Sequence, residues 1–461
     1  MNTPLRLLFV AILGISSFSL TGQTIVSSLI TTNQTWDISG SPYIIGSNVL
    51  INQGVTVTVL PGTIIKSPAQ KTLIVDGELV AKGKKDTVIT FDSVSIQLTT
   101  KSTGYDFSSN TGSVFRYCLF RGNSMGGQKT IDVNRVSLLV SNCKFLNTYY
   151  GVYAYNSYYD TTKVRIENSI FDYTGFNYGY ALYAGGQYTY IEMEECSVNN
   201  SYGIYITNHT LITKSSFTNW HGNSGLRLNL YGSFYEGDIT ITCNYFNKFR
   251  YSVIEMVGVP TKIKTIISYN TFDSSERFLD ISLMSSSNKV NTLKIEYNNF
   301  LKYTKNSVFV HGGNNPGSAD TLLLQNNYWG TTNTAQIDGG ISDFNDDITV
   351  AAVIDYSSNL SAKQTQCNNP NPGGGGAGVK DIAASEFRIY PNPSSGNIQL
   401  EIGDNGWKQI AIKDLNGKDM IVENTNSNSV FLNCSSLNAG IYLVQVSGIH
   451  GVSQQKLLIQ K

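Results

Sequence analysis

The sequence is poor in charge. Only 14% of its 461 residues are Asp, Glu, Lys or Arg, whereas roughly a quarter is usual in a soluble domain. Acidic and basic residues number 33 each, so the formal net charge is zero. A chain without a basic surface lacks the electrostatic attraction that holds nucleic acid or an anionic membrane surface. We therefore expect no nucleic-acid partner.

Histidine and cysteine are scarce too. None of the four histidines lies in a pair at metal-ligand spacing, and no pair of the six cysteines has zinc spacing. So few cysteines do not make a disulfide scaffold in a chain of this length. A phosphate-binding glycine loop and a nucleophile elbow are also missing. These absences predict no cofactor and no transition-metal site.

Long apolar runs are confined to the N-terminus. Residues 1–22 contain one basic residue, Arg6, then an apolar run from Leu7 to Ile15, and a suitable cleavage point between Ser19 and Gln23. This pattern is typical of a secretory signal peptide; a buried first strand is the alternative. No later segment is long and apolar enough to cross a bilayer. We therefore expect export, and no transmembrane segment in the mature chain.

The chain is rich in uncharged polar and aromatic residues, with 28 tyrosines and 42 glycines, as extracellular β-proteins are. It also repeats. Nine segments each end on an aromatic or apolar residue, the anchor, and the anchors span 208 residues in eight steps, a mean period of 26. The residue five before each anchor is apolar and the next is mostly polar, which indicates a strand with one buried face. A second strand follows each anchor. The anchors are Phe120, Phe145, Phe171, Val198, Phe217, Phe246, Phe272, Phe300 and Tyr328.

Two residues before each anchor runs a column of small or amide side chains, which changes to asparagine in the C-terminal half. Asparagines stacked in register can join their amides along the stack, which requires parallel strands from successive repeats. The column predicts an all-β fold, a right-handed parallel β-helix over residues 23–366; asparagines that merely mark turns are the alternative. The last four members, Asn244, Asn270, Asn298 and Asn326, form the predicted asparagine ladder, which we expect to be structural.

The β-helix, which we call the rod, should start near Tyr43 and have about 12 coils. At about 4.8 Å per strand layer its length would be roughly 55 Å. Cys118 and Cys143 belong to the same column and face inward on adjacent coils. Strand spacing permits a disulfide between them, but free buried thiols are favoured.

One outward-facing column on the second strands is a candidate site. It contains Tyr153, Tyr183, Tyr205, Arg227, Glu255, Asp280 and Phe309, with His311 two positions further along the last strand. Stacked tyrosines offer apolar ring faces to sugars while their hydroxyls stay wet. We take Tyr153, Tyr183, Tyr205, Phe309 and His311 as candidate carbohydrate-binding residues. A second concentration, Tyr149 to Tyr190, holds twelve of the 28 tyrosines and favours binding on that half of the rod.

The charged members of this column leave three interpretations open. Adjacent carboxylates of Glu255 and Asp280 would suit a retaining glycosidase or a Ca²⁺ site, and Arg227 could supply the base of a lyase. Arg227 and Glu255 also form an ordinary cross-strand charge pair, and tyrosine is a good strand former, so a solvated scaffold accounts for the column as well. The third interpretation is that the column binds an extracellular polysaccharide without catalysing a reaction.

The chain ends in a separate unit. Residues 367–380, with the run "NNPNPGGGGAG", are a flexible linker. Residues 381–461 alternate short strands with turn signals such as "YPNPSSGN" and "DLNGK", which predicts a small Ig-like β-sandwich of about seven strands.

Both parts resemble known families. Residues 43–360, and above all the opening segment and "NNYWGTTNTAQIDGGISDFNDDITVAAVIDY", resemble secreted bacterial β-helix proteins of the pectin-lyase-like superfamily. That resemblance implies the fold but no single activity. Residues 381–461 resemble the C-terminal sorting domain of type IX secretion, with Cys434 at a position that is usually polar. The matching residues are Tyr390, Pro391, Asn392, Pro393, Gly396, Asp414, Asn416, Gly417, Lys418, Gly440 and Tyr442.

The second resemblance implies the partner and the destination. Such domains are read by the type IX secretion machinery and are usually removed, leaving the cargo released or attached to the cell surface. We expect a monomer that passes through the periplasm to the outer cell surface or the medium. An ordinary accessory or sugar-binding sandwich is the alternative for the tail.

Overall fold

The structure, a computed structural model, describes residues 22–460 with internal gaps. The gaps are 124–125, 157–161, 175–178, 208, 219–223, 231–236, 259–262, 284–292, 313–319, 368–386, 403–407, 415–417, 426 and 449–450. Nearly all of the predicted signal peptide and the linker after residue 367 lie outside the described residues. So do two of the predicted sorting residues, Asn416 and Gly417.

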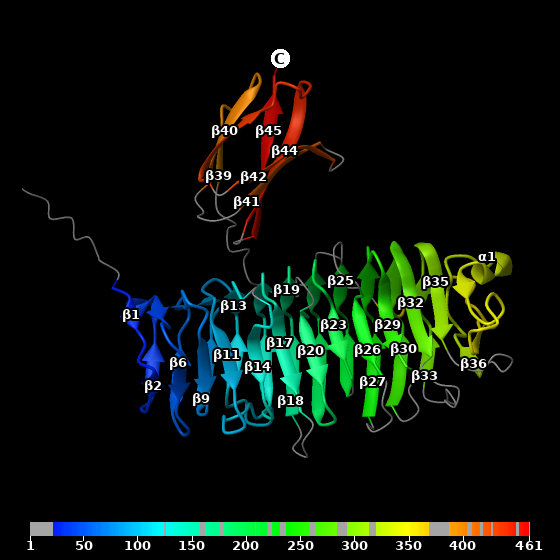
Figure 1. The fold of residues 1–461 in the computed structure, drawn as a ribbon, viewed down its shortest axis with the longest axis horizontal. Helices are drawn as coiled ribbons and strands as arrows, with labels where there is room; N and C mark the ends of the chain where they lie inside the picture. The colour runs from blue at the N-terminus through cyan, green and yellow to red at the C-terminus, as the bar shows by residue number, and fades with distance from the viewer. Residues whose placement is uncertain are drawn as a thin grey trace, which may run out of the picture.

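The N-terminal part is a parallel β-helix in which three sheets run along one axis (Figure 1). Sheet A contains β1 (Thr24–Ile25), β4 (Tyr43–Ile44), β7 (Ile64–Lys66), β10 (Ile89–Asp92), β13 (Cys118–Arg121), β16 (Lys144–Leu146), β19 (Ile170–Asp172), β22 (Ser197–Asn199), β25 (Ser216–Thr218), β28 (Tyr245–Asn247), β31 (Thr271–Asp273) and β34 (Asn299–Phe300).

Sheet B contains β2 (Leu29–Ile30), β5 (Val49–Ile51), β8 (Thr72–Val75), β11 (Ser95–Leu98), β14 (Lys129–Val133), β17 (Tyr150–Tyr155), β20 (Leu182–Gly185), β23 (Ile204–Ile206), β26 (Leu226–Asn229), β29 (Ser252–Val257), β32 (Ser275–Leu283), β35 (Tyr303–Gly312) and β37 (Ile341–Ser342). Sheet C contains β3 (Gln34–Trp36), β6 (Thr56–Val59), β9 (Glu78–Lys82), β12 (Val114–Arg116), β15 (Leu138–Ser141), β18 (Thr162–Glu167), β21 (Thr189–Glu194), β24 (Thr210–Thr213), β27 (Gly237–Thr242), β30 (Ile263–Ser268) and β33 (Leu293–Glu296).

The described strands number 12, 13 and 11 in the three sheets, which confirms the fold class and a rod of about twelve coils. Its first coil begins at Thr24, earlier than the predicted Tyr43, because β1 already pairs with β4. The C-terminal end is completed by β36 (Asp320–Leu323), β38 (Ala352–Asp355) and the short helix α1 (Thr334–Asp338). A 3-10 turn, Ile38–Gly40, lies near the other end.

Each coil has three strands rather than the two that were predicted. The anchor does not end the strand of sheet C; it lies on its own short strand in sheet A. The residue before each column residue has a left-handed backbone, with φ between 49° and 59°, as in Tyr117, Asn142 and Cys243. This residue turns the chain between sheets C and A. Few of these corner residues are of a type that prefers φ above zero, so the third strand had no clear sequence signal.

The anchors stack inside the rod. Phe145 lies 4.6 Å from Phe171, and Phe246 lies 5.1 Å from Phe272, measured between ring centroids. The last anchor is Trp329, whose ring lies 4.8 Å from Phe300. The predicted anchor, Tyr328, instead pairs with Asn299 in the register and is half-buried. Because Tyr328 and Trp329 are both aromatic and adjacent, the sequence allowed either of them to be the last anchor.

The same one-residue shift changes the asparagine ladder. Asn244, Asn270 and Asn298 are fully buried and joined by amide hydrogen bonds, with Asn244 Nδ2 donating to Asn270 Oδ1 at 3.0 Å. The next member is Asn327, to whose Oδ1 Asn298 Nδ2 donates at 3.0 Å. Asn326, the predicted member, is the left-handed corner residue with φ 58°, so its inclusion in the ladder was wrong.

Three of the six cysteines lie in the same inward column as these asparagines. Cys118, Cys143 and Cys196 are buried and free, and burial raises the pKa of the Cys196 thiol to about 12. A disulfide that was not predicted joins Cys243, a corner residue, to Cys367. The rod therefore includes residue 367, which the sequence had assigned to the linker.

The C-terminal part is an antiparallel sandwich of seven strands, as predicted. One sheet consists of β39 (Phe387–Tyr390), β40 (Asn397–Ile402) and β43 (Ser429–Asn433). The other consists of β42 (Asp419–Thr425), β41 (Lys408–Lys413), β44 (Gly440–Gly448) and β45 (Gly451–Ile459). Buried residues of both sheets, among them Leu400, Ile412 and Val444, form one core. Across the residues that the structure covers, no helix is long and apolar enough to span a membrane.

Candidate functional site

The outward column on sheet B has the register that the sequence suggested. Tyr153 pairs with Tyr183, and Tyr183 pairs with Tyr205 on the next coil. The column continues through Arg227, Glu255, Asp280 and Phe309, one residue per coil. His311 lies on the same strand, β35, two positions beyond Phe309. The structure thus brings all eight candidate residues onto one face of the rod.

The three tyrosines of the column lie ring on ring. Centroids are 4.6 Å apart between Tyr153 and Tyr183 and 4.5 Å apart between Tyr183 and Tyr205, with interplanar angles of 8° and 3°. Rings this close must lie face to face, because coplanar rings side by side would overlap. The faces of Tyr183 are therefore covered by its neighbours, and ring edges and hydroxyls point outward. The expected stacking of sugars on the faces of these rings does not fit this geometry.

A second column of tyrosines lies three residues earlier on each coil, at Tyr150, Tyr180 and Tyr202. The Tyr150 ring is nearly perpendicular to Tyr153 and Tyr183, at 76° and 84°. The faces of Tyr153 are occupied by Tyr183 and by the Lys129 ammonium, 3.7 Å from the ring centroid. Since both faces of the Tyr153 ring are covered, the near-perpendicular contact must place the face of the Tyr150 ring against the edges of the stacked rings. This geometry adds Tyr150 to the site.

Tyr180 and Tyr149 complete this cluster. Tyr180 lies 6.1 Å from Tyr183 and 5.5 Å from Tyr205, tilted by about 60° to each. Tyr149 meets Tyr150 at 5.0 Å and 78°. We call the seven half-buried residues the tyrosine patch: Tyr149, Tyr150, Tyr153, Tyr180, Tyr183, Tyr202 and Tyr205. Its second column was missed at the sequence level, although a tyrosine three residues before each stacked one was a usable signal.

Burial favours the protonated form of four tyrosines of the patch. It raises the pKa of Tyr150, Tyr153 and Tyr183 above the ordinary value of 10, and that of Tyr180 to about 12. Neighbouring tyrosines add to the effect at Tyr183, because a phenolate beside further phenolates would be repelled. These four residues therefore present neutral hydroxyls, each able to donate and accept a hydrogen bond.

Charged pairs lie at both ends of the patch. At one end Lys129, which covers Tyr153, is paired with Asp132 at 3.0 Å. Burial raises the pKa of Asp132, although Lys129 acts in the opposite direction. At the other end the Asn229 amide donates to the Tyr205 hydroxyl, and Arg227 pairs with Glu255 at 3.7 Å.

The two candidate catalytic carboxylates are already engaged by protein groups. Glu255 accepts a hydrogen bond from Ser224 at 2.9 Å, in addition to its contact with Arg227. Asp280, whose side chain is only 14% exposed, contacts Ser252, Arg277 and His311, at 3.1, 3.4 and 2.9 Å.

Arg277 also lies 4.3 Å from the centroid of Phe309, so it covers that ring. Arg277, Ser224 and Ser252 were not foreseen. Within the described ranges, no three His, Cys, Asp or Glu side chains are grouped to hold a metal ion.

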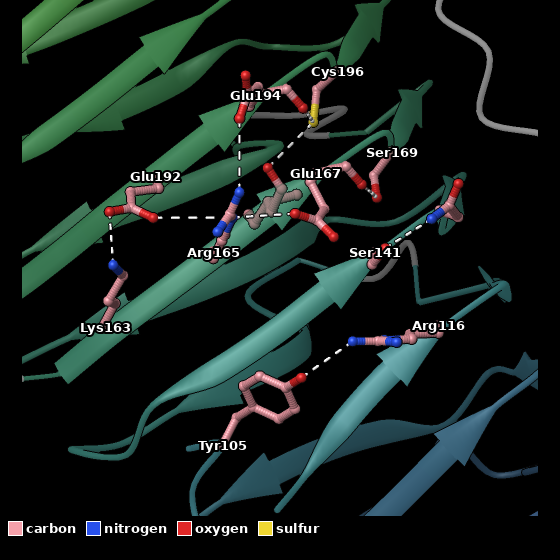
Figure 2. Close-up of polar contacts among 12 residues, drawn as sticks. Tyr105, Arg116, Ser141, Lys163, Arg165, Glu167, Ser169, Glu192, Glu194 and Cys196 are labelled. Carbon is pink, nitrogen blue, oxygen red and sulfur yellow. Dashed lines mark hydrogen bonds and ion pairs between the residues drawn. The ribbon is translucent and has the colours of Figure 1, made fainter. Parts of the chain in front are cut away.

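Sheet C has a different surface, built from ion pairs. Figure 2 shows Arg165 between Glu167, Glu192 and Glu194. Its guanidinium nitrogens lie 3.1, 4.0 and 3.7 Å from their carboxylate oxygens. Lys163 adds a pair with Glu192 at 2.7 Å. These charges alternate across neighbouring strands and are a third or so exposed, as expected of a solvated scaffold. The aromatic face on sheet B is therefore distinct.

In the C-terminal sandwich, the predicted sorting residues build turns. Asn392 accepts from the backbone N–H of Leu458 at 2.9 Å and donates to the carbonyl of Lys456 at 2.7 Å, so it pairs with β45 like a strand residue. Its neighbours Pro391 and Pro393 fix the loop around it, and Tyr390 donates to Glu401.

The other sorting residues close further loops. Gly396 accepts from the N–H of Cys434 at 2.7 Å, and Cys434 is buried in the sandwich core. Asp414 and Lys418 bond across the hairpin, and Tyr442 at the start of β44, beside Gly440, donates to the carbonyl of Asn438.

Residues 388–460 match the family described as secretion system C-terminal sorting domain. No curated protein and no solved structure matches the chain, so the resemblance of the rod to the pectin-lyase-like superfamily stays unconfirmed. The match confirms the predicted sorting domain at the C-terminus. The sandwich is a type IX sorting domain, and the chain is exported by the type IX secretion machinery to the outer cell surface or the medium.

Proposed function

We propose that this exported β-helix protein is a non-catalytic binding or adhesion module whose tyrosine patch binds an extracellular polysaccharide. The observation that carries the proposal is the patch itself, in which seven tyrosines on three coils are fixed by ring contacts of 4.5–6.4 Å. Rigid aromatic groups give binding energy at little cost in side-chain entropy.

The patch offers sugars two kinds of contact. The stacked column presents a row of hydroxyls, one per coil, that can hydrogen-bond to sugar hydroxyls. Tyr150 and Tyr180 stand at large angles to that row and supply aromatic surface for the apolar C–H groups of a sugar. Because the row follows the rod axis, an extended glycan would lie along sheet B rather than across it.

A glycan array with purified rod, residues 24–367, tests the proposal. Wild type should bind at least one polysaccharide, and a triple change of Tyr153, Tyr183 and Tyr205 to Ala should weaken binding at least tenfold. The matched control is Tyr245→Ala, which removes a half-buried outward tyrosine from sheet A instead. Absence of binding by wild type, or equal loss in the control, would refute a glycan site at the patch.

Lyase or hydrolase activity is the competing function, and the partners of Glu255 and Asp280 weigh against it. Asp280 would have to give up contacts with its protein partners before it could act as a nucleophile or base. The same holds for Glu255. Assays of new unsaturated sugars and of reducing ends, over uronate and neutral polysaccharides, separate the two functions. Turnover that disappears in Glu255→Gln or Asp280→Asn would replace binding by catalysis.

A further inference from the structure

The last described segment of the rod turns back along it. After β38 the chain is at the C-terminal end, and residues 360–367, which we call the strap, then lead away from that end. The Leu360 N–H donates to the Asn327 carbonyl at 2.9 Å. The Gln364 N–H donates to Asn299 Oδ1 at 2.7 Å, and Asn299 Nδ2 donates back to the Gln364 carbonyl at 3.0 Å.

The strap ends at the disulfide between Cys367 and Cys243. In sheet A, Asn299 pairs with Thr271, and Thr271 pairs with Tyr245, two residues after Cys243. From Asn327 to Cys243 the strap therefore steps back three coils, about 14 Å at about 4.8 Å per coil. The chain leaves the rod on its flank, and not at its end.

That flank is the edge opposite the tyrosine patch. Along one coil the chain runs through sheet C, the left-handed corner residue, sheet A and then sheet B, as in β27, Cys243, β28 and β29. A three-sided rod has three edges, and the edge between sheets C and A faces away from sheet B. Cys243 lies on this edge, whereas Tyr183 and Arg227 lie on sheet B.

We infer that the strap and its disulfide fix the tether of the sorting domain to the edge opposite sheet B, so that a rod held by its C-terminal side presents sheet B outward. Residues 368–386 separate Cys367 from the first strand of the sandwich, and the length and partly glycine-rich sequence of this segment predict an end-to-end separation of roughly 25 Å. Whatever grips the sorting domain is thus kept near the C–A edge. The face with the tyrosine patch is left open to large partners. This inference does not depend on what that face binds.

Single-molecule energy transfer in the purified full-length chain tests the placement. One dye goes on Met420→Cys, an exposed position of β42. The second goes either on Lys214→Cys, at the C–A corner one coil before Cys243, or on Arg227→Cys, on sheet B of the same coil as Lys214. The two rod positions have the same height along the axis and differ only in the side of the rod. The four free cysteines are buried, so they should stay unlabelled.

Transfer from Met420→Cys should be clearly more efficient to Lys214→Cys than to Arg227→Cys. Adding Cys243→Ser and Cys367→Ser should lower transfer to Lys214→Cys, because the exit point moves toward the rod end. Equal or higher transfer to Arg227→Cys in the disulfide-bonded chain would overturn the inference. Should the double serine variant not fold, Asn299→Ala loosens the strap instead, and the comparison of the two dye positions still decides.

Discussion

Asn327 Oδ1 accepts two hydrogen bonds from Asn298, one from its backbone N–H at 2.8 Å and one from its side-chain amide at 3.0 Å. The Asn327 amide in turn donates to the carbonyls of Ile295 and Leu324, at 2.8 and 2.7 Å. Both side chains are fully buried. Asn327 therefore ends the ladder and provides hydrogen-bond partners for the backbone and side-chain amide groups of the coil before it.

We predict that Asn298→Leu and Asn327→Leu each destabilise the rod by about 1–3 kcal/mol, because each leaves buried amide and carbonyl groups without partners. Asn326→Gly should change stability little, since residue 326 is a half-buried corner residue whose φ of 58° suits glycine. Denaturant or thermal melts of the purified rod measure all three. A loss at residue 326 larger than at residue 327 would contradict this register.

Most of the register between successive coils could be predicted from the sequence, for a physical reason. A stacked fold repeats the same environment in each coil, so Phe145, Phe171 and Phe272 mark equivalent positions and the outward residues follow by counting. Counting failed where the repeat gave no unique answer, as at the adjacent aromatics Tyr328 and Trp329. It could not show the corner conformation, which residues as different as Tyr117 and Cys243 adopt.

The site was predictable in its members but not in its geometry. The register placed Tyr153, Tyr183 and Tyr205 in one column, but only the structure shows that their faces are used up by one another. Contacts between distant segments, such as the disulfide of Cys243 with Cys367, depend on loops whose paths no periodicity encodes.

A second prediction concerns the disulfide. It closes a loop of 124 residues, for which loop-closure entropy alone gives about 5 kcal/mol, and a disulfide typically contributes about 2–4 kcal/mol. Cys243→Ser with Cys367→Ser, or reduction of wild type, should lower the melting temperature and open the C-terminal coils first, because each coil is held mainly by its neighbours. Melts and limited proteolysis with and without reductant check this. Cleavage beginning in the N-terminal coils would argue against a local role of the strap.

The tyrosine patch should make the rod sensitive to alkali. Burial raises the pKa of Tyr183 above 10 and that of Tyr180 to about 12 in the folded rod. Between the ordinary value of 10 and these raised values, the unfolded chain has lost phenolic protons that the folded chain keeps. Stability from this source is complete below pH 10 and falls as the pH rises through the folded pKa values.

We therefore expect the ultraviolet absorbance of tyrosinate to rise later in the folded rod than in denatured rod. Denaturant melts above pH 10 should show falling stability, with a shallower fall in Tyr183→Phe, which cannot ionise. Tyr297→Phe, which removes a phenol at a corner outside the patch, is the control. Coincident titration of folded and denatured rod would show that the phenols are not buried as described.

The last prediction concerns export. Removing residues 381–461 takes away the sorting domain, so the rod should accumulate in the periplasm, measured by cell fractionation. A single change should act in the same direction, because Asn392 holds its loop to β45 through Leu458 and Lys456. Asn392→Ala removes both hydrogen bonds, at a cost of about 1 kcal/mol each, and should reduce the exported fraction.

The control for this change is Asn424→Ala, which alters an exposed residue of β42 bonded only weakly to Gln409, at 3.3 Å. Circular dichroism of the purified full-length chain establishes that each variant is folded. Undiminished surface or medium protein after removal of residues 381–461 would show that another part of the chain directs export. Equal effects of Asn392→Ala and Asn424→Ala would show instead that the loop geometry around residue 392 is not what the machinery reads.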